Sequence, residues 1–150
     1  MAAARAGIIT EEMKAVAAKE YRTEEEIRDL VARGQVAICA NKLHKCLDPN
    51  GIGSMLRTKI NVNLGVSRDC KDYDIEMKKV MAAVDMGAEA IMDLSSHGDT
   101  QPFRRKLTAE CPAMIGTVPV YDSVIHYQRD LSELTAHDFI DVIRLHAEDG

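Results

Sequence analysis

Hydrophobic and polar residues follow two different patterns along this chain, and the change of pattern divides it in two. Up to residue 58 the sequence shows two stretches of helical periodicity and a turn-rich loop. From residue 59 onward, short apolar strands alternate with amphipathic helices three times. This pattern predicts an α/β fold, with an N-terminal helical hairpin and loop region over 1–58 and three βα units over 59–150.

Two helices are predicted in the first region, over 10–20 and 23–34, and each opens with a threonine as N-cap. The second helix has the stronger signals. Thr23 and Glu26 have the spacing of a capping box, and Gly34 closes the helix. A short strand over 35–40 then leads into the loop over 41–58, which contains His44, a residue without an evident physical role. Loops of this length are more often functional than simple connectors.

The second region has the order of a parallel sheet with helical crossovers. Its strands read as nearly continuous apolar runs, as expected when both faces of a sheet are covered. The predicted strands are 59–65, 88–94 and 113–120, and the predicted helices are 73–87, 101–110 and 134–150. Three such units do not close a barrel. The region is therefore either a small open sheet or the first part of a larger barrel.

One spacing connects the three units. Asn63, Met92 and Tyr121 follow one another at intervals of 29 residues (92−63 and 121−92). If the units repeat in register, these side chains lie at equivalent heights near the carboxyl ends of three strands. Ligands bind at this end of parallel α/β sheets and barrels, so the three residues are candidates for a binding site.

Composition and charge narrow the function. The net charge of −5 argues against nonspecific nucleic-acid binding, and no apolar run resembles a signal peptide or a membrane span. A cytoplasmic protein that binds neither nucleic acid nor membrane is expected. The spacing of the four cysteines matches no compact metal motif, so they are expected to be reduced thiols: Cys39, Cys46, Cys70 and Cys111.

Several motifs together resemble one enzyme family. "GIITEEMKAVA", "ICANKLH", "GIGSMLRTKINVNLG", "GAEAIMDLSSHGDT" and "MIGTVPVYDSV" occur in the order and spacing of the N-terminal part of the phosphomethylpyrimidine synthase (ThiC) family. Its sister branch is the anaerobic 5-hydroxybenzimidazole synthase (BzaF) type. The resemblance covers nearly the whole chain. "NVNLGVSRDC" and "AMIGTVPVYD" look more like the hydroxybenzimidazole branch, which contributes to the cobalamin lower ligand.

The resemblance implies a radical S-adenosylmethionine carbon–carbon lyase, built on a (β/α)8 barrel, that rearranges 5-aminoimidazole ribotide. It also implies a homodimer that holds a [4Fe-4S] cluster, S-adenosylmethionine and a further divalent metal. The family's cluster and metal motifs have no counterpart in these 150 residues. The chain alone is therefore expected to bind none of these cofactors and to show no turnover.

The resemblance also assigns the candidate site. Family positions that bind the ribotide fall on Asn63, Met92 and Tyr121, the residues that the 29-residue interval selects. An amide offers a donor and an acceptor, a thioether packs on a flat heterocycle, and a phenol donates to phosphate. No catalytic residue and no metal ligand is predicted. Asp93 is expected to anchor a loop or cap a helix, and His126, His137 and His146 are expected to be surface or packing residues.

Three functions follow from this sequence. The first is the N-terminal part of a radical S-adenosylmethionine lyase, with 5-hydroxybenzimidazole as the preferred product and the thiamine pyrimidine, hydroxymethylpyrimidine phosphate, as the alternative. The second is a non-catalytic ribotide-binding fragment. The third, a generic sugar-phosphate enzyme, requires an acid/base pair at strand ends, and Asp93 is the one candidate there.

Overall fold

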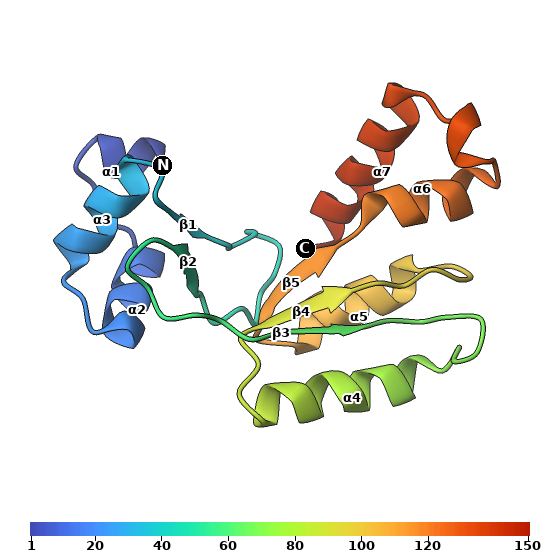
Figure 1. Ribbon diagram of the computed structural model, residues 1–150, viewed down its shortest axis with the longest axis horizontal. Helices are drawn as coiled ribbons and strands as arrows, with labels where there is room; N and C mark the ends of the chain where they lie inside the picture. Colours follow the sequence, from blue (N-terminus) through green and yellow to red (C-terminus); the bar gives the residue numbers. More distant parts are fainter. The chain divides into compact units, whose positions relative to one another are not determined.

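The computed structural model describes residues 1–150 and separates them into two compact units. The first unit contains residues 1–40 and 48–59, and the second contains residues 41–47 and 60–150. The short segment 41–47 therefore packs with the second unit, although unit-one residues flank it on both sides. Figure 1 shows the elements of each unit. No helix is both long and apolar enough to cross a membrane.

The first unit is a small helical module with a two-stranded hairpin. Its helices are α1 (Ala2–Arg5), α2 (Glu11–Glu20) and α3 (Glu24–Ala32), and β1 (Val36–Ile38) pairs antiparallel with β2 (Gly51–Gly53). The predicted capping box of α3 is confirmed, because Thr23 Oγ1 accepts from Glu26 N at 3.2 Å and Glu26 Oε2 accepts from Thr23 N at 2.9 Å. Helix α1 and strand β2 were not predicted.

The second unit is built on a three-stranded parallel sheet in the order β3–β4–β5, as predicted. The strands are β3 (Asn61–Leu64), β4 (Ala90–Asp93) and β5 (Met114–Thr117). Asn63 pairs with Met92, and Met92 pairs with Gly116. Because neighbouring parallel strands end at the same edge, the turns after all three strands lie at one end of the sheet.

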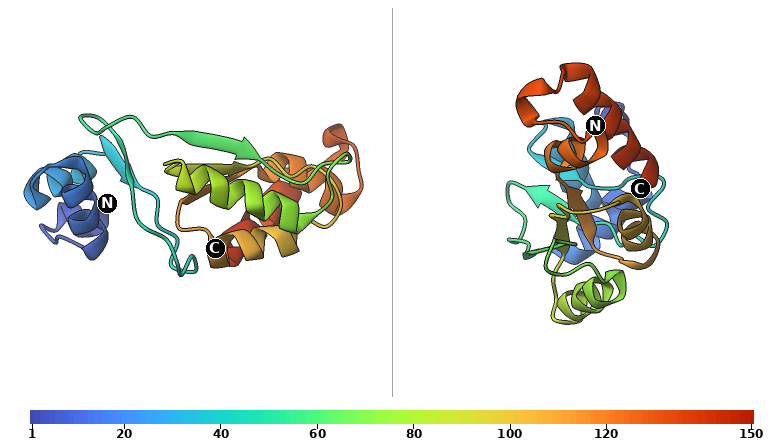
Figure 2. Two further views of the ribbon diagram at one scale, coloured as in Figure 1. Left: turned by 90° about the horizontal axis from the view of Figure 1, so that it is seen from below. Right: turned by 90° about the vertical axis from the view of Figure 1, so that its right-hand side faces the viewer.

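Two helices cover one face of this sheet, and Figure 2 shows them beside it from two further directions. They are α4 (Tyr73–Asp85) and α5 (Gln101–Glu110). Asp72 caps α4 by accepting from Asp74 N and Ile75 N. The core beneath them includes Ile91, Phe103 and Leu107, all fully buried. Burial of these apolar side chains is the main force that holds the helices on the sheet.

The third βα unit of the sheet differs from its prediction. The strand predicted over 113–120 ends at Thr117, and helix α6 (Pro119–Tyr127) begins where the strand was expected to continue. Pro119 causes this switch, because proline lacks the N–H of a ladder and fits the first turn of a helix. A 3₁₀ turn, η1 (Leu131–Glu133), then leads to α7 (Ala136–Asp149).

Helix α7 opens with a capping box. Thr135 Oγ1 accepts from Asp138 N at 3.4 Å, and Asp138 Oδ2 accepts from Thr135 N at 2.8 Å, which completes a capping box with aspartate in the third position. The predicted α/β class and the three βα units are thus present. The sheet has three strands and does not close, so the (β/α)8 barrel is not a feature of this structure.

Candidate functional site

The face of the sheet opposite α4 and α5 carries two of the three predicted ligand residues. Side chains alternate across each strand, so Asn63 and Met92 share one face, while Ile91 points into the core beneath the helices. Asn63 is exposed, and Met92 is half-buried. The two residues are direct partners in the parallel register, which confirms the prediction that Asn63 and Met92 lie at the same height on neighbouring strands.

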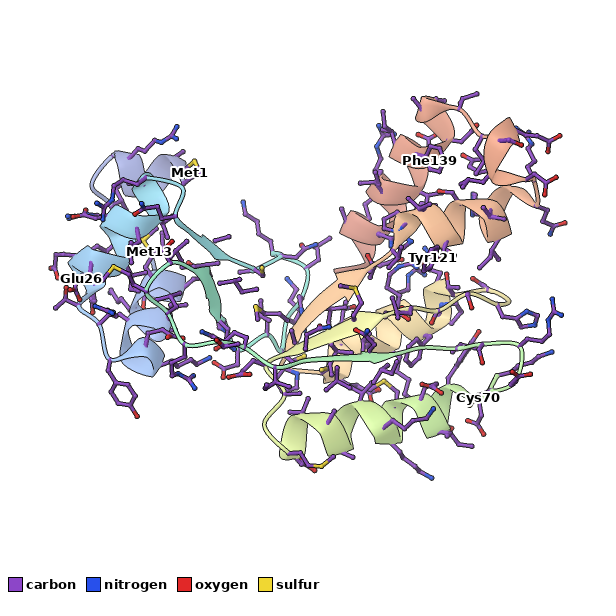
Figure 3. All side chains as sticks on the ribbon, viewed as in Figure 1. Met1, Met13, Glu26, Cys70, Tyr121 and Phe139 are labelled. Carbon is purple, nitrogen blue, oxygen red and sulfur yellow. The ribbon has the colours of Figure 1, made fainter.

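Tyr121 does not lie at the height of Asn63 and Met92, contrary to the prediction from the 29-residue interval. The register partner of Met92 on β5 is Gly116, and Tyr121 follows five residues later, in the first turn of α6 (Figure 3). The expectation that Tyr121 lies at the same height as Asn63 and Met92 is therefore wrong. Tyr121 still belongs to the turn that leaves the carboxyl end of β5, and it is 51% exposed. The interval fails because β5 ends early at Pro119.

Two contacts shape the surface around Asn63 and Met92. Asn61 Nδ2 donates to Asn63 Oδ1 at 2.8 Å, which orients the Asn63 amide. Met92 packs over Gly116, since a Cβ atom at Gly116 would lie 2.9 Å from both Met92 Sδ and Met92 Cε. A glycine at this position lets the thioether lie flat against the neighbouring strand.

The turns after β3 and β4 are joined by hydrogen bonds. Leu94 N donates to Leu64 O at 2.7 Å, and Ser96 N donates to Val66 O at 3.0 Å. Val66 N in turn donates to Ser95 Oγ at 3.0 Å. These bonds continue the strand pairing beyond the sheet, so both turns are held as one rim at its carboxyl edge.

Asp93 anchors this rim, as predicted. Its Oδ1 accepts from Ser95 N at 2.9 Å and from Ser95 Oγ at 2.5 Å, and the side chain is buried. Burial raises the pKa of the Asp93 carboxyl, although the bonds from Ser95 and the charge of Arg104 oppose the shift. The structure thus gives Asp93 the role of a loop anchor.

Asp93→Asn is expected to stabilise the protein at neutral pH. Asparagine keeps a carbonyl oxygen for the Ser95 bonds and removes a buried charge. Because the folded-state pKa of Asp93 lies above the unfolded value of 3.8, the wild-type protein loses stability as pH rises through the folded-state pKa. Urea unfolding should therefore give the variant the higher free energy of unfolding at pH 7. The gain should vanish at pH 3, and a gain of equal size at both pH values would contradict this account.

A buried polar cluster lies beside the rim, at the carboxyl ends of β4 and β5. Asp122 Oδ1 accepts from Thr100 Oγ1 at 2.6 Å, and Asp122 Oδ2 faces His146 Nε2 at 2.8 Å and Arg104 NH1 at 3.3 Å. Arg104 also binds Asp149 Oδ2 at 2.9 Å. The cluster therefore ties α5, α6 and α7 together.

Opposing effects act on the Asp122 carboxyl. Burial by itself would raise its pKa, but bonds from His146 and Thr100 and the charge of Arg104 outweigh burial and hold the pKa at about 2. Thr100, Arg104 and Asp122 also border a cavity of about 780 Å³ between the β4–α5 loop, α6 and the end of α7. The carboxylate thus remains charged at neutral pH, with its partners already in place.

His44 has a structural role that its sequence did not reveal. The buried ring donates from Nε2 to Cys111 O at 2.7 Å, just before β5. Asn41 Nδ2 donates to Ala147 O at 2.9 Å. These two bonds fasten segment 41–47 to the unit it packs with.

The side chains of this chain do not fit an iron–sulfur cluster. No three histidine, cysteine or acidic side chains are grouped so that they could hold a metal ion. Cys39 is exposed, Cys111 is buried, and Cys46 and Cys70 are half-buried. Cys46 Sγ lies 3.2 Å from Cys111 O, as a packed thiol rather than a ligand. No chemical step is therefore assigned to a cluster on these residues.

Sequence reasoning missed the buried cluster almost entirely. The sequence gives the three helical histidines the same expected role, but His146 is largely buried and hydrogen-bonded, whereas the side chain of His137 is 81% exposed. A signal was present. Val142, His146 and Asp149 follow one another at helical spacing, so a buried apolar stripe continues into polar residues. Polar residues on a buried stripe require partners.

Comparison with known proteins identifies close relatives. The family model described as "Radical SAM ThiC family" matches residues 1–150. The chain is 58% identical over 150 residues to a phosphomethylpyrimidine synthase of Alkaliphilus oremlandii, and 56% identical to one of Clostridioides difficile. A phosphomethylpyrimidine synthase of Clostridium kluyveri is 53% identical. Each match covers the whole chain, which spans about a third of each relative's length (34%, 35% and 34%).

Proposed function

This chain belongs to the radical SAM ThiC family, and on that premise we propose that it forms the ribotide-binding part of a phosphomethylpyrimidine synthase. The observation that carries the proposal is the match over all 150 residues to relatives of that name. The sequence-based preference for the hydroxybenzimidazole branch has no support from these relatives. The proposed product is therefore the thiamine pyrimidine, which was the alternative.

The proposed substrate is 5-aminoimidazole ribotide, held at the carboxyl edge of the sheet. The Asn63 amide, oriented by Asn61, bonds polar atoms of the imidazole or ribose. Met92 lies against the flat heterocycle, and the Tyr121 hydroxyl donates to the phosphate. These residues bind and orient the ribotide, which lowers the barrier by fixing the geometry of the reacting atoms.

The family match implies a [4Fe-4S] cluster and S-adenosylmethionine in full-length members, and these supply the radical chemistry. In a complete enzyme, we propose that the β3 to β5 units form the first three of a (β/α)8 barrel and that the active form is a homodimer. The activity is that of a carbon–carbon lyase. This chain's part is to position the substrate.

Titration of the 150-residue chain with 5-aminoimidazole ribotide in a calorimeter tests the proposal. Saturable binding is expected, and Asn63→Ala should weaken it about tenfold through loss of its hydrogen bonds. His137→Ala is the matched control, because His137 is exposed on α7, away from the sheet edge. A folded chain that does not bind the ribotide, or that binds it equally after Asn63→Ala, would refute the assignment.

A chimera tests turnover. In it, these 150 residues replace the aligned third of the Alkaliphilus oremlandii relative. Once its cluster is reconstituted, the chimera should form the pyrimidine phosphate and 5′-deoxyadenosine from the ribotide and S-adenosylmethionine. Asn63→Ala in the chimera should lower that rate, and the chain alone should form no 5′-deoxyadenosine. An active chimera that is indifferent to Asn63 would contradict the assigned site.

A further inference from the structure

The first turn of α6, which carries Tyr121, has no side-chain N-cap that would fix its orientation. Val118 occupies the N-cap position and makes no side-chain cap bond. Pro119 pre-sets one backbone angle, and Tyr121 N donates to Val118 O at 3.0 Å. Both the restricted proline angle and this hydrogen bond are local to the turn, so neither links it to other parts of the second unit. The direction of Tyr121 must therefore be set by tertiary contacts.

Asp122 supplies those contacts. Its carboxylate accepts from Thr100 before α5, from Arg104 on α5 and from His146 on α7. His146 Nδ1 also lies 2.9 Å from Thr117 Oγ1, at the last residue of β5. The imidazole ring thus connects the end of the strand with the first turn of the helix that follows it. The carboxylate is fixed from two neighbouring helices and, through this ring, from the strand.

Helix geometry carries this constraint to Tyr121. Successive residues on a helix point about 100° apart, so a turn that buries Asp122 points its neighbour Tyr121 away from the cluster. Tyr121 is accordingly 51% exposed, whereas Asp122 is 9% exposed. Rotating the turn would expose Asp122 and break three charge-assisted or hydroxyl bonds. The cluster therefore fixes the direction in which the Cα–Cβ bond of Tyr121 leaves the helix.

We propose that Asp122 is a positioning residue for Tyr121, acting through its bonds to Thr100, Arg104 and His146. Asp122 itself does not touch the ribotide. It holds the first turn of α6 so that the Tyr121 hydroxyl stays at the carboxyl edge of the sheet. The ribotide part of this inference rests on the proposed function, but the placement of the tyrosine ring does not.

The placement is tested without any ligand. The chain has four tyrosines, so 3-fluorotyrosine labelling gives four ¹⁹F resonances, and Tyr121→Phe identifies the one from Tyr121. Asp122→Asn should shift and broaden that resonance and leave the resonance of Tyr21, in the other unit, unchanged. Asp85→Asn is the control, because Asp85 is an exposed carboxylate at the end of α4. An unchanged Tyr121 resonance in a folded Asp122→Asn protein would overturn the proposal.

Ribotide binding gives the second arm, as a double-mutant cycle. Asp122→Asn and Tyr121→Phe should each weaken binding about fivefold, and the double variant should bind no more weakly than Tyr121→Phe alone. A general loss of structure would instead weaken binding in both backgrounds. If the wild-type chain binds no ribotide, the proposed function fails, and the fluorine resonances still decide the role of Asp122.

A milder variant covers the case in which Asp122→Asn does not fold. Thr100→Val removes one of the three donors to Asp122 and keeps a side chain of similar shape. It should move the Tyr121 resonance in the same direction by a smaller amount. A folded Thr100→Val protein with wild-type resonances would also overturn the proposal.

Discussion

Gly65→Ala is expected to destabilise the second unit by about 3 kcal/mol or more, the size that follows from a forbidden backbone conformation combined with a backbone clash. Gly65 follows β3 with φ +145°, a region that is essentially closed to residues with a Cβ atom. An added Cβ would lie 2.5 Å from Ser95 N and 2.8 Å from Leu94 C. Both contacts are backbone atoms of the turn after β4, so no side chain can move aside.

Urea unfolding monitored by far-ultraviolet circular dichroism measures this loss. Gly98→Ala is the control, because Gly98 has φ +72° but no atom within 4 Å of an added Cβ. Gly98→Ala should lower the free energy of unfolding by about 1 kcal/mol, because only the left-handed backbone conformation is unfavourable for alanine there. The two turns form the rim of the candidate site, so any Gly65→Ala protein that still folds should also bind the ribotide poorly. Equal losses for the two variants would show that the close approach of the turns does not matter.

Arg104→Met is expected to cost about 3–5 kcal/mol, because it leaves the buried Asp122 carboxylate without its arginine. The Arg104 side chain is 3% exposed and bonds both Asp122 and Asp149. Methionine replaces the aliphatic part of the side chain, so packing is largely kept and the charge is what is lost. The neighbouring Arg105 offers a matched control. It also reaches Asp149, at 2.8 Å, but is 64% exposed, so Arg105→Met should cost about 0–1 kcal/mol.

The defect of Arg104→Met should depend on pH. In the wild-type protein the Asp122 pKa of about 2 lies below the unfolded value of 3.8, so its contribution is complete above pH 3.8 and is lost as pH falls toward 2. Without Arg104 the Asp122 pKa is lowered less, so the carboxylate contributes less stability above pH 3.8. The difference in unfolding free energy between the two proteins should therefore be largest near pH 7 and should narrow below pH 4. A difference independent of pH would indicate lost packing rather than an unpaired charge.

Much of the fold could be predicted from local signals. Threonine N-caps marked the starts of α2 and α3, and Gly34 marked the end of α3. Alternating strands and helices predicted the parallel sheet and placed Asn63 beside Met92. Each of these features depends on residues a few positions apart, or on a period that repeats along the chain. The strand over 35–40 was also predicted. Its partner β2 was not, because β2 has only three residues and two of them are glycines.

The candidate site was predicted less completely. The family resemblance supplied the candidate ligand residues, and the 29-residue interval correctly predicted that Asn63 and Met92 lie side by side. Tyr121, which was expected just after the third strand, lies in the first turn of α6 because Pro119 ends β5 early. The loop motifs favoured the hydroxybenzimidazole branch, whereas the relatives that match the whole chain, at up to 58% identity, are phosphomethylpyrimidine synthases.

The sequence by itself determined the class of fold, the order of its elements, the sheet face that bears Asn63 and Met92, and the family. These follow from caps, periods and motifs that each lie within a short stretch of chain. Only the tertiary structure decided that Asp122, Arg104 and His146 form one buried cluster, next to Tyr121 in the first turn of α6. These residues lie on three helices and are separated by 18 and 24 positions (122−104 and 146−122). Their contacts arise when the helices pack, because a buried charge is stable only where the fold brings its partners within bonding distance.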